Sequence, residues 1–172
     1  AGFIGAHLAN ILKKKNKIMK VDNLENKGGI PFIHKSSIFI KGNILDIKIL
    51  KKIKKWKPNI IYHLAAQSGG EGAYDDPKKD FNTNGYGTYL IAKLAKKINC
   101  KYFIYASSVA VYGSSNKILT ENSKINPDSI YGISKYSGEM FVNQILKKTK
   151  VKVRIFRIFN TYGPGENLLN LK

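Results

Sequence analysis

A tyrosine and a lysine that could do acid–base chemistry stand four residues apart in the stretch 129–139, which reads SIYGISKYSGE. In a helix, residues at this spacing lie on one face, one above the other. A lysine ammonium near a phenol favours the phenolate, so Tyr131 beside Lys135 could act as a base near neutral pH. Because the chain has 10 tyrosines and is rich in lysine, the spacing alone is equally typical of a solvated helix face.

Two further groups of residues could bind a dinucleotide. Gly2 and Gly5 open a predicted helix over 3–14, where glycines let a pyrophosphate approach the backbone at the helix N-terminus. Asp22 ends a predicted strand over 17–24, near the spacing from Gly2 at which a carboxylate meets the adenosine ribose 2′-hydroxyl. A carboxylate there repels a 2′-phosphate, which favours NAD over NADP. A plain helix start and a turn aspartate are the structural alternatives.

The elements that must position these residues alternate between strand and helix. The pattern predicts further strands over 37–42, 59–64, 101–106 and 152–159, and further helices over 46–56, 79–97 and 131–148. This alternation predicts an α/β fold of the Rossmann type, a doubly wound parallel sheet with helices on both faces. Two glycines inside the third helix, Gly85 and Gly87, indicate close packing there.

The composition indicates a globular chain, with 43% hydrophobic residues and a formal net charge of +19. The positive charge is almost wholly lysine spread along helices, and only Arg154 and Arg157 are arginines, so we expect no nucleic-acid partner. A single cysteine, Cys100, excludes an intramolecular disulfide, and no Cys/His cluster indicates a metal. His63 lies within a strand and is expected to be a core residue. No apolar run is long enough for a membrane span and no signal peptide is visible, so we expect a cytoplasmic protein with no membrane partner.

Seven motifs follow one another along the whole chain: Gly2-Phe3-Ile4-Gly5, Asp22-Asn23, His63-Leu64-Ala65-Ala66-Gln67, Asn84-x-x-Gly87-Thr88, Ser107-Ser108-x-x-Val111-Tyr112-Gly113, Tyr131-x-x-x-Lys135 and Arg157-x-Phe159-Asn160-x-x-Gly163. In this order they resemble the extended short-chain dehydrogenase/reductase family. Within that family they resemble the NAD-dependent nucleotide-sugar epimerases of the UDP-glucose 4-epimerase kind.

The resemblance implies an isomerase of carbohydrate metabolism and a role for each catalytic residue. Tyr131 would remove the proton from the sugar 4-hydroxyl while hydride passes from C4 to NAD, and hydride would return to the other face of the 4-keto intermediate. Lys135 would bind the nicotinamide ribose and keep the pKa of the phenol low. Ser108 would bridge the sugar oxygen and the phenol.

The resemblance also implies binding residues. Asn160 and Ser108 would contact the nucleotide-sugar substrate, and Asn43 stands where the family usually has an aspartate that faces adenine. No metal is implied. The residues expected to bind NAD are Gly2, Phe3, Ile4, Gly5, Asp22, Asn23, Asn26, Asn43, Ile44, Leu64, Ala65, Ala66, Gln67, Asn84, Tyr131, Lys135 and Phe159.

In the family, a strand and a first glycine precede the position of Ala1, and a substrate-binding domain follows that of Lys172. We therefore expect residues 1–172 to be an incomplete NAD-binding domain, with the first strand missing and the C-terminal substrate-binding domain absent. Without that strand, the strands over 18–21 and 60–64 should not be hydrogen-bonded to each other. The isolated chain should therefore fold poorly and bind NAD weakly. For the full-length protein the resemblance implies a homodimer built on the helices over 79–97 and 131–148.

Other functions compete with epimerisation. The nearest are a 4,6-dehydratase, a decarboxylase or a reductase of the same family. Family dehydratases and decarboxylases place an acid one or two residues after the Ser108 position, since elimination needs a general acid. Here Val109 and Ala110 stand there, so epimerisation or reduction remains. A non-catalytic NAD-binding or scaffold protein is the rival from another class, and the presence of both Tyr131 and Lys135 argues against it.

Overall fold

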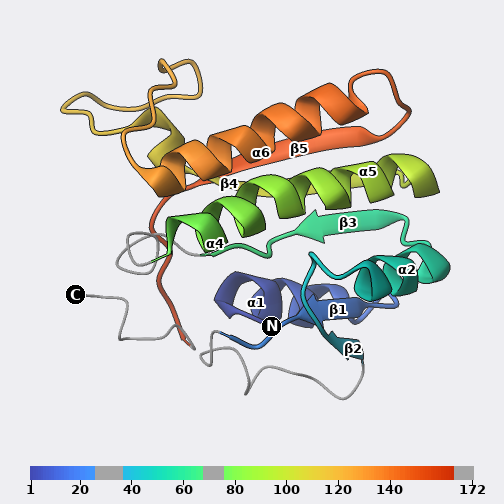
Figure 1. Cartoon of the computed structure of the whole chain (residues 1–172). Coiled ribbons are helices and arrows are strands. Elements are labelled where there is room, and N and C mark those ends of the chain that lie inside the picture. Colours follow the sequence, from blue (N-terminus) through green and yellow to red (C-terminus); the bar gives the residue numbers. More distant parts are fainter. Residues whose placement is uncertain (26–36, 68–75, 165–172) are drawn as a thin grey trace.

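The computed structural model describes residues 1–25, 37–67 and 76–164, and strands and helices alternate along them (Figure 1). The order is α1 (Phe3–Leu12), β1 (Met19–Asp22), β2 (Ile38–Lys41), α2 (Ile47–Trp56), β3 (Ile60–His63), α4 (Pro77–Phe81), a π-helical turn η2 (Asn82–Gly87), α5 (Thr88–Ile98), β4 (Tyr102–Ser108), a 3₁₀ turn η3 (Val109–Tyr112), α6 (Ile130–Leu146) and β5 (Lys152–Ile158). The predicted α/β class is confirmed, and each predicted strand and helix is present with ends shifted by a few residues.

All strand pairs among the described residues are parallel. β3, β4 and β5 form one sheet in that order, and β1 pairs with β2 in a second, two-stranded sheet. Within the described part of the chain, β1 and β3 share no ladder of hydrogen bonds, as predicted for strands 18–21 and 60–64. Because β3, β4 and β5 are parallel, their carboxyl ends lie at one edge of the three-stranded sheet.

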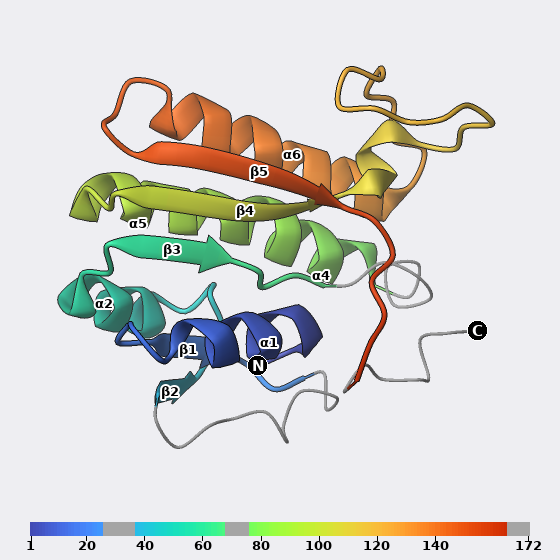
Figure 2. The same ribbon diagram turned by 180° about the vertical axis from the view of Figure 1, so that it is seen from behind.

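Helices lie on both sides of the strands, as in a doubly wound fold. α5 and α6 cover one face of the three-stranded sheet, while α1 lies on the opposite side, over β1 (Figures 1 and 2). On the face turned away from α5 and α6, Ile60, Tyr62 and Phe156 are 42%, 38% and 56% exposed. That face of the three-stranded sheet therefore carries exposed apolar side chains in the part of the chain that the structure describes.

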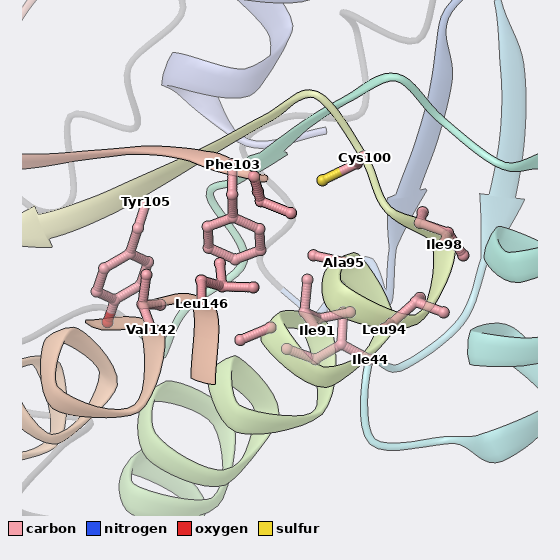
Figure 3. Packing of buried hydrophobic residues seen from close by; sticks show 12 residues of the cluster. Ile44, Ile91, Leu94, Ala95, Ile98, Cys100, Phe103, Tyr105, Val142 and Leu146 are labelled. Carbon is pink, nitrogen blue, oxygen red and sulfur yellow. The ribbon is translucent and has the colours of Figure 1, made fainter. Parts of the chain in front are cut away.

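The main core lies between the three-stranded sheet and helices α5 and α6 (Figure 3). Phe103 and Tyr105 point from β4 into this layer and are fully buried, as are Ala92 and Ala95 of α5 and Val142 of α6. Burying one such large side chain stabilises the fold by roughly 1.5–3 kcal/mol. This layer holds α6, and with it Tyr131 and Lys135, against the end of β4.

The helix predicted over 79–97 is interrupted by the π-helical turn η2. A Cβ on Gly87 would lie 2.6 Å from Ile44 Cδ1, and one on Gly85 would lie 2.9 Å from Ser137 Oγ. The close packing inferred from the two glycines is therefore confirmed, and a wider turn at this point is typical of functional regions. None of the helices among the described residues is long and apolar enough to span a membrane.

Candidate active site

Ser108 and Tyr131 meet at the carboxyl end of β4. β4 runs two residues further than predicted, so Ser108 is its last residue, and its hydroxyl accepts from the Ala110 N–H at 3.2 Å. Ser129 caps the start of α6 by accepting from the Gly132 N–H at 3.1 Å. A Cβ on Gly132 would overlap the Ala110 carbonyl, so glycine at this position lets α6 begin close to the turn η3 that follows β4. The Ser108 hydroxyl acts on the Tyr131 phenol in the direction that lowers its pKa.

Lys135 lies one turn further along α6 and is only 3% exposed. Its ammonium donates to the Ala106 carbonyl and lies 4.8 Å from the centre of the Tyr105 ring. Burial lowers the pKa of Lys135 to about 8, although the negative charges of Asp80 and Glu139 act in the opposite direction. The ammonium is thus easier to deprotonate than that of an ordinary lysine.

The expectation that Lys135 lowers the pKa of the Tyr131 phenol is wrong for this structure. Burial raises the pKa of Tyr131, the Asp80 charge raises it further, and only the Ser108 hydrogen bond lowers it. The reason is the direction of the lysine, whose ammonium turns to the Ala106 carbonyl and the Tyr105 ring. The four-residue spacing correctly predicted that Tyr131 and Lys135 share a helix face. It did not predict that the Lys135 ammonium would contact the Ala106 carbonyl and the Tyr105 ring.

A buried cluster formed by Asp80, Asn84 and Ser134 supports the turn of α6 that carries Tyr131 and Lys135. The Asn84 amide donates to Asp80 Oδ1 at 2.7 Å, and its oxygen accepts from the Gln67 N–H at 2.9 Å. Ser134 Oγ lies 2.9 Å from Asp80 Oδ2 and 2.8 Å from the Tyr131 carbonyl oxygen. Asp80 is 0%, Asn84 1% and Ser134 1% exposed. In this structure, the side chain of Asn84 is therefore held by protein groups and positions the loop after β3.

A second buried cluster joins α6 to the ends of β4 and β5. Arg157 forms a bidentate ion pair with Glu139, with Nε 3.0 Å from Oε1 and Nη2 2.9 Å from Oε2. Ser107 Oγ donates to Glu139 at 2.5 Å, and Arg157 Nη1 donates to the Tyr112 hydroxyl at 2.8 Å. The Glu139 hydrogen bonds are the main reason why the pKa of Arg157 is raised. Since Ser107 precedes Ser108, this cluster fixes the strand end that carries Ser108.

The residues expected to hold a pyrophosphate and a ribose also lie close together. Gly2 caps α1 without a side-chain hydrogen bond, and nothing lies within 4 Å of where its Cβ would be. Asp22 ends β1, and its carboxylate lies 2.6 Å from the amino group of Ala1 and accepts from the Leu24 N–H at 2.7 Å. Leu64 follows β3, and its Cδ1 would lie 3.5 Å from a Cβ on Gly5. An open helix N-terminus with a carboxylate beside it fits the phosphates and ribose of a dinucleotide.

The remaining predicted binding residues lie around this edge or contribute to packing. Asn43 uses its side-chain oxygen to accept from the Leu45 N–H at 2.9 Å, and Ile44 is buried. Asn23 accepts from the Glu25 N–H at 3.2 Å, and Phe159 is 55% exposed. Among the other predicted residues, Phe3 and Ala65 are partly buried, Ile4, Ala66 and Asn160 are exposed, and Asn26 lies outside the described residues.

The segment after β5 reaches back to the start of α1. His7 Nε2 donates to the Pro164 carbonyl at 2.9 Å, and a Cβ on Gly163 would lie 3.3 Å from Phe3 Cζ. The motif that begins at Arg157 therefore ends beside the glycine motif at the other end of the chain. This contact brings the segment that carries the predicted substrate residue Asn160 toward the predicted phosphate-binding edge.

Sequence reasoning missed several buried residues around the site: Asp80, Tyr105, Ser107, Ser134 and Glu139. Glu139 follows Tyr131 and Lys135 at the same four-residue spacing, so the helical face that predicted the first two also contained it. His63 was predicted as a core residue, which is confirmed by its 3% exposure and its hydrogen bond to Thr88 Oγ1 at 2.8 Å. No residue spacing indicated Asp80 or Tyr105, whose positions depend on the tertiary fold.

Comparisons with known proteins agree with this geometry. The chain is 36% identical to a dTDP-D-glucose 4,6-dehydratase of Dictyostelium discoideum, over 96% of this chain and 43% of that protein. A UDP-glucose 4-epimerase of Thermotoga maritima, solved with UDP-glucose, superposes with a TM-score of 0.91 at 30% identity, over 97% of this chain and 55% of that one. A UDP-glucuronic acid 4-epimerase from Bacillus cereus, solved with NAD, gives a TM-score of 0.85 at 27% identity, over 97% and 56%.

These similarities extend over nearly all of the chain but only part of each relative. The chain spans about half the length of the relatives it matches. The matched relatives include both a dehydratase and epimerases, so they share a family and not one reaction. A family model described as the NAD dependent epimerase/dehydratase family matches residues 1–170, and the chain belongs to this family.

Proposed function

We propose that the protein containing this chain is an NAD-dependent nucleotide-sugar 4-epimerase. The observation that carries the proposal is that Ser108 at the end of β4 acts on the Tyr131 phenol and is followed by two apolar residues and not by an acid. Val109 and Ala110 follow Ser108 in the turn η3. Of the nearby buried acids, Asp80 is held by Asn84 and Ser134, and Glu139 is held by Arg157.

This arrangement supports epimerisation over dehydration. Elimination of water needs a general acid at the leaving hydroxyl, whereas epimerisation at C4 needs only one group that takes and returns a proton. Tyr131 is that group, and its phenol oxygen holds the proton of the sugar 4-hydroxyl between the two half-reactions. Ser108 keeps the phenol in place and stabilises the phenolate by donating to it. NAD, when bound, accepts hydride from the sugar and gives it back.

Residues of the present chain would hold the cofactor at the edge where β1, β3 and β4 end. The N-terminus of α1 at Gly2 and Gly5 would take the pyrophosphate, and Asp22 would accept from the adenosine ribose hydroxyls. Lys135 would bind the nicotinamide ribose. We propose that residues 1–172 form an incomplete NAD-binding domain, and that most contacts that select the sugar lie in a further domain.

The test uses the complete gene product with NAD and a panel of UDP- and dTDP-hexoses, and each product is identified by NMR. We expect interconversion of a pair of C4 epimers, with no net change in NAD. Tyr131→Phe should lower turnover by about 100-fold or more, because it removes the proposed proton acceptor. Tyr136→Phe, a half-buried tyrosine of the same helix, serves as the matched control. A 4-keto-6-deoxy product would contradict the proposal and favour a dehydratase, and net oxidation of NADH would favour a reductase.

We further propose that the complete protein is a homodimer. Apolar side chains remain exposed on the outer surface of the helical layer, including Tyr86, Ile133 and Met140 at 48%, 52% and 51%. Tyr89 stacks on Tyr86 with ring centroids 5.7 Å apart. Exposed apolar side chains on the outer faces of neighbouring helices are the kind of surface that a protein interface covers. Light scattering at micromolar concentration should give the mass of a dimer, and Met140→Lys should reduce it; a monomeric unmutated protein would contradict this proposal.

A further inference from the structure

Within residues 1–25, 37–67 and 76–164, Asp80 and Lys135 are two buried charged groups that form no salt bridge. Asp80 is 0% and Lys135 3% exposed. The third buried charge nearby, Glu139, is already neutralised by the bidentate pair with Arg157. None of the ion pairs within the described residues includes Asp80 or Lys135. A buried charge that lacks a compensating charge is costly, so each of these two groups requires one.

The Asp80 cluster brings the carboxylate up to the catalytic turn. Ser134 Oγ lies 2.9 Å from Asp80 Oδ2, and Ser134 directly precedes Lys135 in α6. Ser134 Oγ is also 2.8 Å from the Tyr131 carbonyl oxygen, so the carboxylate is anchored between the turns that carry Tyr131 and Lys135. Asn84 donates to the other carboxylate oxygen at 2.7 Å. The cluster therefore holds Asp80 in one position. Burial raises the pKa of Asp80, whereas the Ser134 hydrogen bond, the Lys135 charge and the Asn84 hydrogen bond act in the opposite direction.

We propose that Asp80 is a positioning residue that acts as the buried countercharge of Lys135 and thereby keeps this lysine protonated at neutral pH. The role of Lys135 in catalysis rests on the proposed function, but the charge pairing does not. The Asp80 charge favours the protonated lysine and opposes ionisation of the Tyr131 phenol. Asp80 thus sets the charge state of the two catalytic groups of α6 without touching the substrate.

The other ionisable groups around Lys135 do not replace Asp80. His63 of β3 is neutral near pH 7, because burial lowers its pKa to about 3. Tyr105 of β4 is protonated, because burial raises its pKa. Glu139 also favours the protonated lysine, but its charge is shared with Arg157 and the Ser107 hydroxyl. Among the described residues that act on Lys135, Asp80 is the negative charge that forms no salt bridge with a cation.

The test measures the pKa of Lys135 directly in the complete gene product. Lysine labelled with ¹³C at Cε is titrated by NMR, and the Lys135 signal is identified by its absence from Lys135→Met. Asp80→Asn keeps the shape and removes the charge, so it should lower the Lys135 pKa by about one unit or more. Ser134→Ala removes a hydrogen bond but keeps the charge, and should change this pKa much less. An unchanged Lys135 pKa in Asp80→Asn would overturn the proposal.

A second measurement covers the case in which Asp80→Asn folds poorly. If the two charges compensate each other, Asp80→Asn/Lys135→Met should be more stable to urea than Asp80→Asn alone, since it no longer buries an unpaired ammonium. A double variant that is no more stable than Asp80→Asn would overturn the pairing. The pH–rate profile links the result to catalysis: both limbs should move to lower pH in Asp80→Asn and stay in place in Ser134→Ala. Absence of any turnover by the unmutated protein would refute the proposed function, while the NMR titration would still decide on the pairing.

Discussion

Arg157, near the end of β5, holds both carboxylate oxygens of Glu139 on α6, with contacts of 3.0 and 2.9 Å. The Glu139 side chain is only 4% exposed and that of Arg157 22%. Glu139→Gln would leave the guanidinium without its countercharge, which costs several kcal/mol in a fully buried pair. Because Arg157 is partly exposed, we expect a loss of about 2–3 kcal/mol in the free energy of unfolding, measured by urea denaturation.

A surface ion pair provides the matched control for this prediction. Lys79 and Glu25 approach to 2.6 Å, but their side chains are 44% and 49% exposed. Glu25→Gln removes the same charge from a solvated pair and should change the free energy of unfolding by less than about 1 kcal/mol. Equal effects of the two substitutions would show that the buried pair does not hold α6 to β5 as described.

Two glycines should respond differently to replacement by alanine. A Cβ on Gly138 would overlap the Tyr105 hydroxyl and lie 3.0 Å from the Asn84 carbonyl oxygen, whereas nothing lies within 4 Å of a Cβ on Gly2. Gly138→Ala should therefore destabilise the fold by about 1–3 kcal/mol. Gly2→Ala should leave the melting temperature nearly unchanged but weaken NAD binding, because the methyl group occupies the space proposed for the pyrophosphate. An unchanged free energy of unfolding in Gly138→Ala would contradict the packing of α6 on β4.

Local patterns in the sequence were sufficient to predict the alternation of strands and helices and the shared face of Tyr131 and Lys135. Both depend on periodicity, which is a property of neighbouring residues. The end of β4 was predicted two residues early, because Ser107 and Ser108 do not read as strand residues. Their extended conformation is set by pairing with Arg157 and Ile158 of β5.

The pKa values of the site residues could not be predicted from local patterns in the sequence. Tyr131 was expected to have a lowered pKa, and the structure gives a raised one, because burial and Asp80 outweigh the Ser108 hydrogen bond. Burial depends on how α6 packs against β4, and Asp80 comes from a helix far away in the sequence. The two glycines of η2 predicted close packing but not the π-helical turn, which places Asn84 between Asp80 and Gln67.

His63 should make the fold sensitive to acid. Its pKa is lowered from 6.5 to about 3 because it is buried, and it stacks on Tyr105 with ring centroids 5.6 Å apart. Below pH 6.5 the unfolded chain gains a proton that the folded chain cannot accept, so stability falls as the pH decreases toward 3. Relative to His63→Gln, the unmutated protein should lose about 3 kcal/mol of unfolding free energy between pH 7 and about pH 4. Parallel pH–stability curves for the two proteins would exclude a buried neutral histidine.

Asp22 should decide between NAD and NADP. Its carboxylate ends β1 beside the start of α1, where it accepts from the Leu24 N–H at 2.7 Å. An adenosine ribose in this position would donate its hydroxyls to the carboxylate, while a 2′-phosphate would be repelled by it. In the complete gene product, Asp22→Ala should weaken NAD binding by about 10-fold or more, as expected for a lost hydrogen bond to a charged group. NADP binding should weaken less or improve, so discrimination between the cofactors decreases.

Calorimetric titration with each cofactor measures this discrimination. Asp46→Ala is the control, because Asp46 is an exposed carboxylate that caps α2 by accepting from the Lys48 N–H at 2.7 Å. It removes the same charge and a similar backbone contact at a place where no cofactor is proposed, so both affinities should stay the same. Equal affinity of the unmutated protein for NAD and NADP would contradict the role given to Asp22. An equal loss of NAD affinity in both variants would point to net charge as the cause.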